Sequence, residues 1–335
     1  MKVYSQGNLI GDFMNTRTLL LLLILSPTLS GCISEESEGS FQEVPPADEI
    51  PNEESQFSVH CIDFDELERC WLLLVPTSLH ESDPAPLLVD IHGGSDDMYQ
   101  QRWTSDFANI SMEQGFIVAY PQGHNNIWNM GSNRGPCLVG VICSEEDDVG
   151  FILQIVDTIM QNHSIDQTRI YVTGWSNGCG MTQRLAVQAS DVFAAAGCMA
   201  MYRFEEAPSD YSPIPFMEIH GVLDEIVYYA TTAPTAIAFG PEKGAIQNLE
   251  SWADLNGCQG SVPELLVSED DHDIRGYTDC ENDTQVMLVT LFYAAHNPYE
   301  HDDPVAQPGR GWANPTGVPS STIVWDFMSQ FTMVD

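Results

Sequence analysis

The 335-residue sequence predicts an α/β fold in which a mainly parallel sheet is flanked by helices. Short apolar runs typical of buried strands alternate with stretches whose apolar residues recur at helical spacing. Several of these runs end in glycine or proline, as expected where a strand buried on both faces meets a loop. Alternating strands and helices form right-handed βαβ units, so ligands should bind beyond the carboxyl ends of parallel strands.

One folded domain is expected over residues 57–335. It opens with FSVHCIDF and RCWLLLVP, which predict a hairpin, and a polar, helix-compatible stretch follows the third strand. Strands are predicted in PLLVDIHGG, FIVAYPQG, TRIYVTGW, VFAAAGCMA, IPFMEIHG and VMLVTLFYAAH. Further helices are predicted in VGFILQIVDTIMQNH, NGCGMTQRLAVQAS, AIQNLESWADLNG and TIVWDFMSQF.

Residues 1–31 have the features of an export signal. Basic residues precede LLLLLIL, a run too short for the roughly 20 residues that span a bilayer. The segment ends in LSGC, Leu29–Cys32, which resembles the lipobox of prokaryotic lipoproteins, where the cysteine is acylated after cleavage. An ordinary signal peptide followed by a coincidental cysteine is the alternative. We expect an extracytoplasmic protein, at the cell surface or secreted, that contacts the membrane only through a lipidated Cys32.

Acidic residues dominate the chain, with 49 Asp and Glu against 11 Lys and Arg. Residues 32–56 are rich in Glu, Ser and Pro and cannot bury a core, so they predict a disordered acidic tether. Binding to phosphate backbones needs clustered basic residues, and a formal net charge of −38 argues against it. Nucleic acid is therefore excluded as an expected partner.

Eight cysteines remain in the predicted domain, an even number that favours disulfides in an exported chain. Eight cysteines allow 105 connectivities, so sequence alone leaves the pairing open. Pairing of neighbours is the simplest arrangement. It gives Cys61–Cys70, Cys137–Cys143, Cys179–Cys198 and Cys258–Cys280. Zinc is the alternative, but the chain has no CxxC or HxxxH pair, and we expect neither a metal nor a cofactor.

The pentapeptide GWSNG, Gly174–Gly178, lies between a predicted strand and a predicted helix. This is the G-x-S-x-G nucleophile elbow, in which a tight turn exposes a serine hydroxyl at a helix N-terminus. Glycines two residues on either side allow the strand and helix to approach closely. Ser176 is therefore the candidate nucleophile, with a merely structural turn as the alternative.

A serine hydroxyl needs an oriented base, and the elbow template places the acid and then the histidine later in the chain. Asp224 follows the strand IPFMEIHG and is the candidate acid, with Glu225 as the second choice. His296 directly follows the last strand and is the candidate base, with His301 as the alternative. His272 lies in EDDHD and is expected in a solvated loop.

Two backbone amides are expected to bind the negative charge that develops on a substrate carbonyl. They are those of Asn177, which follows the nucleophile, and Gly94 in the HGG turn after an early strand. A plain turn is the alternative for HGG. His92 and His220 each precede a glycine at a strand end and are expected to hold neighbouring loops.

Several of these segments occur together in one known family. IHGG, WNMG, EDDVGF, YVTGWSNGCGM, FAAAG, IHGVLDEIVYY and WADLNGC, in this order, resemble esterases described as polyhydroxybutyrate depolymerase-like or feruloyl esterase-like. The resemblance covers residues 57–335. It implies an α/β-hydrolase fold and a Ser–Asp–His triad on Ser176, Asp224 and His296. The family histidine usually stands in Gly-His-x-Trp-Pro, whereas this chain has AAHNPYE.

The same resemblance suggests roles for other residues near these motifs. Trp128 and Trp175 match aromatic substrate-contact positions, although core aromatics under a loop would look the same in the sequence. Asp147 and Asp148 are expected to support nearby loops and to cap the following helix.

The N-terminal signal, the elbow motif and the resemblance together predict an exported serine ester hydrolase that acts through an acyl-enzyme. Expected substrates are hydroxyalkanoate oligomers, acylated polysaccharide or related short esters. A serine peptidase on the same fold and a non-catalytic surface binding protein are the alternatives. With a histidine base, turnover should fall as the pH drops below about 6.5.

Overall fold

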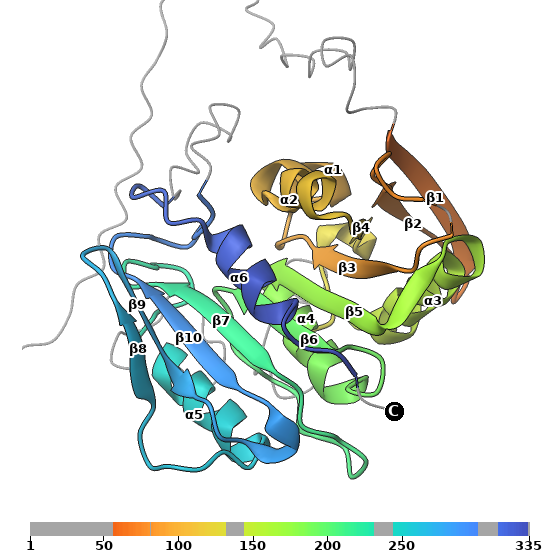
Figure 1. The fold of residues 1–335 in the computed structure, drawn as a ribbon. Coiled ribbons are helices and arrows are strands. Elements are labelled where there is room, and N and C mark those ends of the chain that lie inside the picture. Colours follow the sequence, from red (N-terminus) through yellow and green to blue (C-terminus); the bar gives the residue numbers. More distant parts are fainter. Residues whose placement is uncertain (1–55, 81, 132–143, 231–243, 301–313, 334–335) are drawn as a thin grey trace, which may run out of the picture. The chain divides into compact units, whose positions relative to one another are not determined.

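The computed structural model describes residues 56–80, 82–131, 144–230, 244–300 and 314–333. Within these residues, ten strands form one twisted sheet (Figure 1). In order across the sheet, they are β1 (Phe57–Phe64), β2 (Leu67–Leu74), β4 (Ile117–Pro121), β3 (Ala85–Ile91), β5 (Ile165–Trp175), β6 (Ala195–Met199), β7 (Phe216–Gly221), β10 (Val286–Leu291), β9 (His272–Tyr277) and β8 (Glu264–Ser268).

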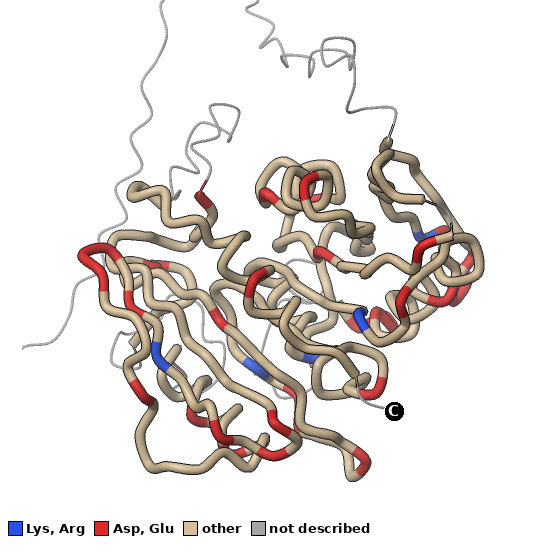
Figure 2. The backbone as a smooth tube through the Cα atoms, viewed as in Figure 1, with Lys and Arg blue, Asp and Glu red and all other residues tan. Residues whose placement is uncertain are grey.

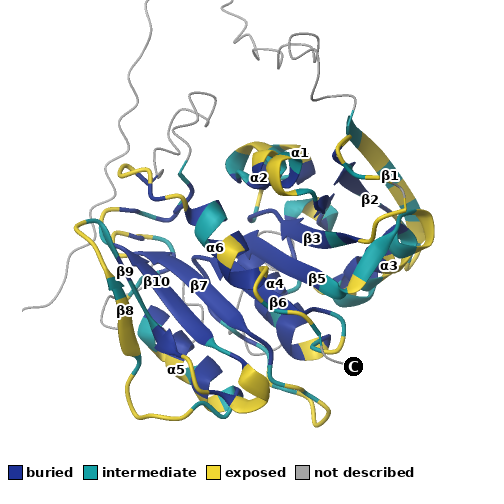
Figure 3. Cartoon of the chain, in the orientation of Figure 1, coloured by how far each residue is buried: buried dark blue, intermediate teal, exposed yellow. Residues whose placement is uncertain are grey.

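The centre of the sheet is parallel and its two edges are antiparallel. From β4 through β3, β5, β6 and β7 to β10, every neighbouring pair runs parallel. The hairpin β1–β2 adds antiparallel to β4, and β9 and β8 continue antiparallel beyond β10. Figure 3 shows that the central strands are buried and that β1 and β8 carry the exposed positions. The carboxyl ends of the parallel strands therefore share one edge, where a site can form.

Helices cover both faces of this sheet. They are α1 (Met98–Thr104), α2 (Phe107–Gln114), α3 (Asp148–Asn162), α4 (Asn177–Gln188), α5 (Ala245–Leu255) and α6 (Ser320–Met328), with short 3-10 turns at His124–Asn126 and Glu281–Asp283. Side chains of α3, α4 and α5 share one core cluster with Val89, whereas those of α1, α2 and α6 share the other with Leu88. These adjacent residues of β3 point to opposite faces, as the two-residue period of a strand requires.

The strands and helices named from the sequence are present, and the fold class is confirmed. The hairpin of β8 and β9 was not predicted, and the solvated loop expected around His272 is wrong. His272 begins β9 beside Leu291 of β10, and its side chain is only 16% exposed. Edge strand β8 has a short apolar run, Leu265–Val267, but four of its five residues are exposed, and so short a run does not by itself indicate a strand.

The N-terminal expectations lie outside the described residues. These are the signal peptide 1–31, the tether 32–56 apart from Gln56, and the acylation site Cys32. Among the helices that the structure describes, none is long and apolar enough to cross a bilayer.

Disulfides join three of the expected cysteine pairs. Cys137 and Cys143 lie outside the described residues, so their pairing stays a prediction. The bonds present are Cys61–Cys70, Cys179–Cys198 and Cys258–Cys280. Because such bonds persist in oxidising compartments, they are consistent with an extracytoplasmic protein.

A buried carboxyl group lies near the end of β3, two residues before the HGG turn. Asp90 of β3 is fully buried and accepts hydrogen bonds from Gln101 Nε2 at 2.7 Å and from Ser105 Oγ at 2.6 Å. Burial raises the pKa of Asp90 to about 7, although both hydrogen bonds oppose the shift. Asp90 is therefore largely protonated in the folded protein below neutral pH, whereas it ionises near pH 4 in the unfolded chain.

This difference predicts a pH-dependent stability. As the pH rises from about 4 to about 7, the unfolded chain loses the proton first, so the contribution of Asp90 to the free energy of unfolding should fall by on the order of 4 kcal/mol. Above pH 7 it should change no further. Denaturant titrations of the wild type and of Asp90→Asn across this range measure the effect as their difference. A difference that is independent of pH would contradict it.

Candidate active site

The predicted elbow is a sharp turn between β5 and α4. Ser176 separates the two elements with φ 53° and ψ −120°, a backbone conformation rare for a residue with a side chain. Its N–H donates to the carbonyl of Met199 on β6 at 2.8 Å, which fixes the turn against the neighbouring strand. The serine hydroxyl is thereby presented at the carboxyl edge of the sheet, at the N-terminus of α4.

The two glycines of the motif are required by close backbone approach. A Cβ on Gly174 would lie 2.7 Å from the Ile91 carbonyl oxygen, and one on Gly178 would lie 2.2 Å from the same oxygen. A Cβ on Gly178 would also come within 2.5 Å of the His92 carbonyl oxygen. Strand β3, strand β5 and helix α4 therefore pack together at distances that only glycine permits.

We expect Gly178→Ala to destabilise the protein by roughly 3 kcal/mol or more, because the obstructing atoms belong to the backbone and cannot rotate away. Gly180→Ala is the matched control in the same helix. The three atoms nearest to its Cβ would all belong to the side chain of Met130, which is flexible, so the loss should be smaller. Urea unfolding of both variants measures the difference, and equal losses would contradict the backbone argument.

Three side chains from distant parts of the chain meet at the elbow. His296 Nε2 lies 2.8 Å from Ser176 Oγ, and His296 Nδ1 lies 2.8 Å from Asp224 Oδ2. Asp224 and His296 are buried, whereas Ser176 is partly exposed. With Asp224 accepting the Nδ1 proton, Nε2 carries the lone pair that faces the serine hydroxyl. The structure thus brings together the three residues that the sequence predicts as nucleophile, acid and base.

The carboxylate of Asp224 is held from several sides. Its Oδ1 accepts the N–H groups of Ile226 and Val227, each at 2.8 Å, while Oδ2 faces His296 and also His220 Nε2 at 3.3 Å. Burial alone would raise the pKa of Asp224, but the hydrogen bonds from His220 and His296 outweigh it and hold the pKa below its usual range. Asp224 is therefore a carboxylate at neutral pH.

The loop that carries His296 rests on the end of β7. A Cβ on Gly221 would lie 2.3 Å from the carbonyl oxygen of Ala294, so this glycine permits a backbone contact. The N–H of Leu223 also donates to that carbonyl at 3.0 Å.

The second choices for the acid and the base are not part of this arrangement. Glu225, the second choice for the acid, is exposed to solvent. His301, the alternative base, lies outside the described residues.

The two residues whose amides are expected to bind an oxyanion, Gly94 and Asn177, are neighbours in space. A Cβ on Gly94 would lie 3.4 Å from the Cβ of Asn177, so the HGG turn and the N-terminus of α4 are in contact. The N–H of Asn177 lies in the first turn of α4, where no carbonyl of the same helix can accept it. Directly after the HGG turn, the N–H of Ser95 donates to the Asn126 carbonyl and that of Asp96 to the Gly93 carbonyl. Gly94, which adjoins Asn177, is therefore the better candidate for the second donor.

Comparison with known proteins identifies a family for this chain. Residues 70–238, half of the chain, match the family model described as Esterase PHB depolymerase. The chain belongs to this family.

The relatives of this chain include esterases and a depolymerase whose names give different ester substrates. Feruloyl esterase B of Piromyces equi is 27% identical over 77% of this chain and 44% of its own length. Poly(3-hydroxyalkanoate) depolymerase C of Paucimonas lemoignei is 35% identical over 70% of this chain and 52% of its own. Bifunctional acetylxylan esterase/xylanase XynS20E of Neocallimastix patriciarum is 26% identical, over 74% and 31%. The chain thus spans about half or less of the length of these relatives.

Solved structures share the fold. An acetyl xylan esterase from Aspergillus awamori superimposes with a TM-score of 0.54 at 18% identity, covering 71% of this chain and 94% of that one. A thermostable esterase also gives 0.54 at 18% identity, covering 83% and 64%. The fold of this family member is the α/β-hydrolase fold.

Both tryptophans expected to contact substrate are buried and hold loops of the site, and Trp128 has no exposed surface. Trp128 is fully buried, and its Nε1 donates to the His92 carbonyl at 3.0 Å, while its backbone is held by the side chain of Asn177. Trp175 is 6% exposed, and its Nε1 donates to the His296 carbonyl at 2.7 Å. Trp128 therefore differs from the expectation, because its indole lies under the HGG turn, and Trp175 holds the histidine loop.

The predicted supporting residues also have defined partners. Asp147 caps α3 by accepting the N–H of Gly150, and Asp148 is buried against Arg69 at 2.7 Å. Asp148 also accepts the N–H of Asn129. His92 bonds the carbonyl of Gly93 and the N–H of Gly123, and burial lowers its pKa to about 4. A neutral His92 ring thus ties the two loops together.

Sequence reasoning missed one group of residues at this site. Glu218 and His220 are two residues apart in β7, so their side chains lie on the same face of the sheet, where they contact each other. His220 also contacts Asp224. His220 was expected only to hold a loop, which it does through Val227. The available signal was a pair of titratable residues two apart within the otherwise apolar strand FMEIHG, whose residues are all buried.

Proposed function

We propose that this chain is an exported serine carboxylic ester hydrolase that acts through an acyl-enzyme. The observation that carries the proposal is the continuous hydrogen-bonded series Ser176–His296–Asp224, at 2.8 Å for each step. It lies at an elbow whose hydroxyl remains partly accessible. Membership of an esterase family supports the same reaction.

Ser176 Oγ attacks the ester carbonyl carbon while His296 Nε2 takes the hydroxyl proton. Asp224 accepts the Nδ1–H of the ring throughout and stabilises the imidazolium. The imidazolium then donates its proton to the departing alcohol, which leaves Ser176 acylated. His296 next removes a proton from a water molecule that attacks the acyl group. The imidazolium returns this proton to Ser176 Oγ as the bond to the acyl carbon breaks, which releases the acid and restores the serine.

The proposed oxyanion donors are the N–H groups of Gly94 and Asn177. Asn177 is held in place by two side-chain hydrogen bonds to the backbone of Trp128, at 2.6 and 3.2 Å. Donors held in place before the reaction need no reorganisation as charge develops, and removal of one typically raises the barrier by about 2.7–4 kcal/mol.

The substrate class follows from charge and from the relatives. Basic residues are scattered rather than clustered over the described body, and acidic ones line many of its loops (Figure 2). Such a surface disfavours polyanionic substrates. Among the relatives are proteins named feruloyl esterase, acetylxylan esterase and poly(3-hydroxyalkanoate) depolymerase. We therefore propose neutral acyl esters, namely hydroxyalkanoate oligomers or feruloylated or acetylated polysaccharide.

A panel of esters tests the proposal. The purified protein should hydrolyse short p-nitrophenyl esters and at least one of feruloyl, acetylxylan and 3-hydroxybutyrate oligomer esters, and should leave peptide anilides intact. Preferential cleavage of the anilides would favour a peptidase. Absence of turnover on every ester, together with measurable binding of one of them, would favour a binding protein.

We also propose that the protein is attached to a membrane through acylated Cys32, on the basis of the LSGC motif. Two acyl chains on one cysteine would be enough for stable anchoring. Expression of the full chain in a bacterium tests this, with Cys32→Ser as the control. Detergent-extractable protein for the wild type and released protein for the variant support anchoring, and release of both would overturn it.

A further inference from the structure

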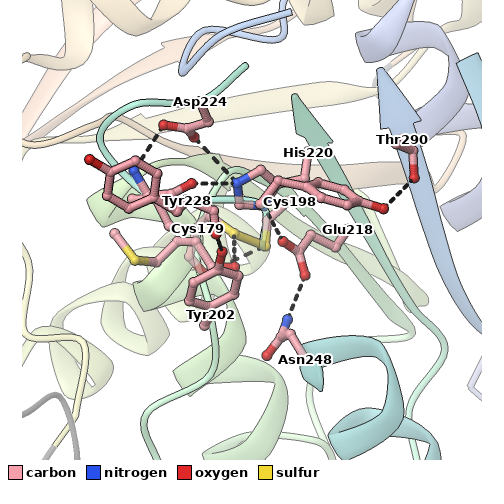
Figure 4. A network of polar contacts seen from close by, with 12 residues as sticks. Cys179, Cys198, Tyr202, Glu218, His220, Asp224, Tyr228, Asn248 and Thr290 are labelled. Carbon is pink, nitrogen blue, oxygen red and sulfur yellow. Dashed lines mark hydrogen bonds and ion pairs between the residues drawn. A yellow bond between two sulfur atoms is a disulfide. The ribbon is translucent and has the colours of Figure 1, made fainter. Parts of the chain in front are cut away.

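The catalytic carboxylate has a second histidine behind it. Figure 4 shows Asp224, His220 and Glu218 in a row, with Asn248 beyond. Asp224 Oδ2 lies 3.3 Å from His220 Nε2, and His220 Nδ1 lies 2.7 Å from Glu218 Oε1. Glu218 and His220 are each at most 1% exposed. The hydrogen-bonded series that begins at Ser176 therefore continues past the acid into the core.

The partners of His220 determine its protonation. Nδ1 faces the carboxyl group of Glu218, and Nε2 faces both the Val227 carbonyl at 2.7 Å and the Asp224 carboxylate. All of these atoms accept hydrogen bonds. A ring flanked by acceptors at both nitrogens is best satisfied with a proton on each, as an imidazolium. Asn248 Nδ2 donates to the other oxygen of Glu218 at 2.6 Å, which suits a carboxylate there.

We propose, on the basis of the esterase function inferred above, that Glu218 and His220 form a buried ion pair whose positive end positions Asp224 and keeps it ionised. Both are positioning residues, because neither contacts Ser176 or the reacting atoms. The pair is neutral overall, so it directs a cation at the catalytic carboxylate without adding net charge to the core. An isolated charge buried there would be costly.

The surroundings of His220 agree with this assignment. Tyr202 stacks on the ring with centroids 5.5 Å apart, and Tyr229 meets it edge-on at 5.8 Å, with its hydroxyl bonded to Thr290 of β10. The charged groups that face the His220 ring are Glu218 of β7 and Asp224 of the following loop. Burial would lower the pKa of His220, but its contacts with Asp224 and Glu218 raise it to about 10.

Glu218 is also fixed from the far side. Asn248 of α5 donates to it and to Gln183 Oε1 of α4 at 3.1 Å, and Trp252 Nε1 donates to the same Gln183 oxygen at 2.9 Å. Burial raises the pKa of Glu218, while the hydrogen bond from His220 opposes this. The polar groups that α4 and α5 direct at one another thus hold the ion pair in place.

The first experiment measures the charge of His220 without using activity. Histidine ¹⁵N NMR of the full protein at pH 8, with the resonances assigned by comparison with His220→Gln, should show a proton on both ring nitrogens of His220. In Glu218→Gln the imidazolium should be lost at a lower pH than in the wild type. A neutral His220 ring at pH 8 in the wild type would overturn the proposal.

The second experiment measures catalysis on a p-nitrophenyl ester. His220→Gln should lower kcat by about 10- to 100-fold with KM little changed. Loss of a residue that orients a metal ligand has an effect of this size, and His220 orients Asp224 in a similar way. Without the cation, the charge of Asp224 is less compensated and favours protonated His296, so the acid limb of the kcat profile should move to higher pH. His272→Gln in β9 is the matched control and should match the wild type. A folded His220→Gln variant with wild-type kcat and acid limb would overturn the proposal.

Two further outcomes are separable. If His220→Gln fails to fold, the His220 resonances are assigned instead as those that change in Glu218→Gln, and the wild-type NMR spectrum at pH 8 decides. If the wild type hydrolyses no ester, the proposed function fails. The NMR measurement still tests whether the ion pair exists beside Asp224.

Discussion

Replacing Ser176 with alanine should lower kcat for ester hydrolysis by roughly 10⁵- to 10⁶-fold, since removal of a nucleophile eliminates the acyl-enzyme route altogether. The hydroxyl accounts for this effect, because alanine has the same Cβ as serine and tolerates the elbow conformation equally well. The N–H of residue 176 would still bond Met199. We therefore expect the variant to keep the wild-type melting temperature while losing activity.

The measurement is kcat and KM on p-nitrophenyl acetate, with mass spectrometry after treatment with a fluorophosphonate as a second readout. The wild type should gain one phosphonyl group on Ser176, and Ser176→Ala should gain none. Ser329→Ala, at the exposed end of α6, is the control and should behave as the wild type. Hydrolysis by Ser176→Ala within tenfold of the wild type would mean that the reaction uses another nucleophile.

Much of this site was predictable because its residues occupy ends of apolar strands. Each triad residue follows a strand that the sequence shows as an apolar run: Ser176 follows β5, Asp224 follows β7 and His296 follows β10. Because these strands are parallel, their carboxyl ends lie at one edge of the sheet. The glycines at 174 and 178 report a backbone contact with β3, which the motif implies without naming the partner. Local patterns therefore locate residues that topology later brings together.

Other features depend on contacts that no local pattern encodes. Trp128 resembles a substrate contact in the sequence, but whether its indole faces a pocket or the core depends on the packing of His92 and Asn177 around it. The partner of His220 is fixed by the path of the loop after β7, which turns back until Asp224 meets the strand. The β8–β9 hairpin was missed because the apolar run of β8, Leu265–Val267, is only three residues long and mostly exposed, and β9 has no sustained apolar run.

Replacing Asp224 with asparagine should lower kcat by about 10⁴-fold, as expected when the histidine is held in the wrong tautomer. The Ile226 and Val227 N–H groups can still bond the amide oxygen at the position of Oδ1, which directs the amide nitrogen toward His296 Nδ1. A donor at that position requires a lone pair on Nδ1 and a proton on Nε2. A ring in this form cannot take the proton of Ser176.

Glu225→Gln is the matched control, since it makes the same chemical change one residue away on an exposed side chain. It should retain wild-type kcat, which would also exclude Glu225 as the acid. Steady-state kinetics on one p-nitrophenyl ester compare the two variants, and circular dichroism checks that both are folded. Asp224 is buried between His220 and His296, so its negative charge stabilises a proton on each of the two rings. If Asp224→Asn were folded and within tenfold of the wild type, His296 would be oriented by something other than this carboxylate, and the proposed role of Asp224 would be wrong.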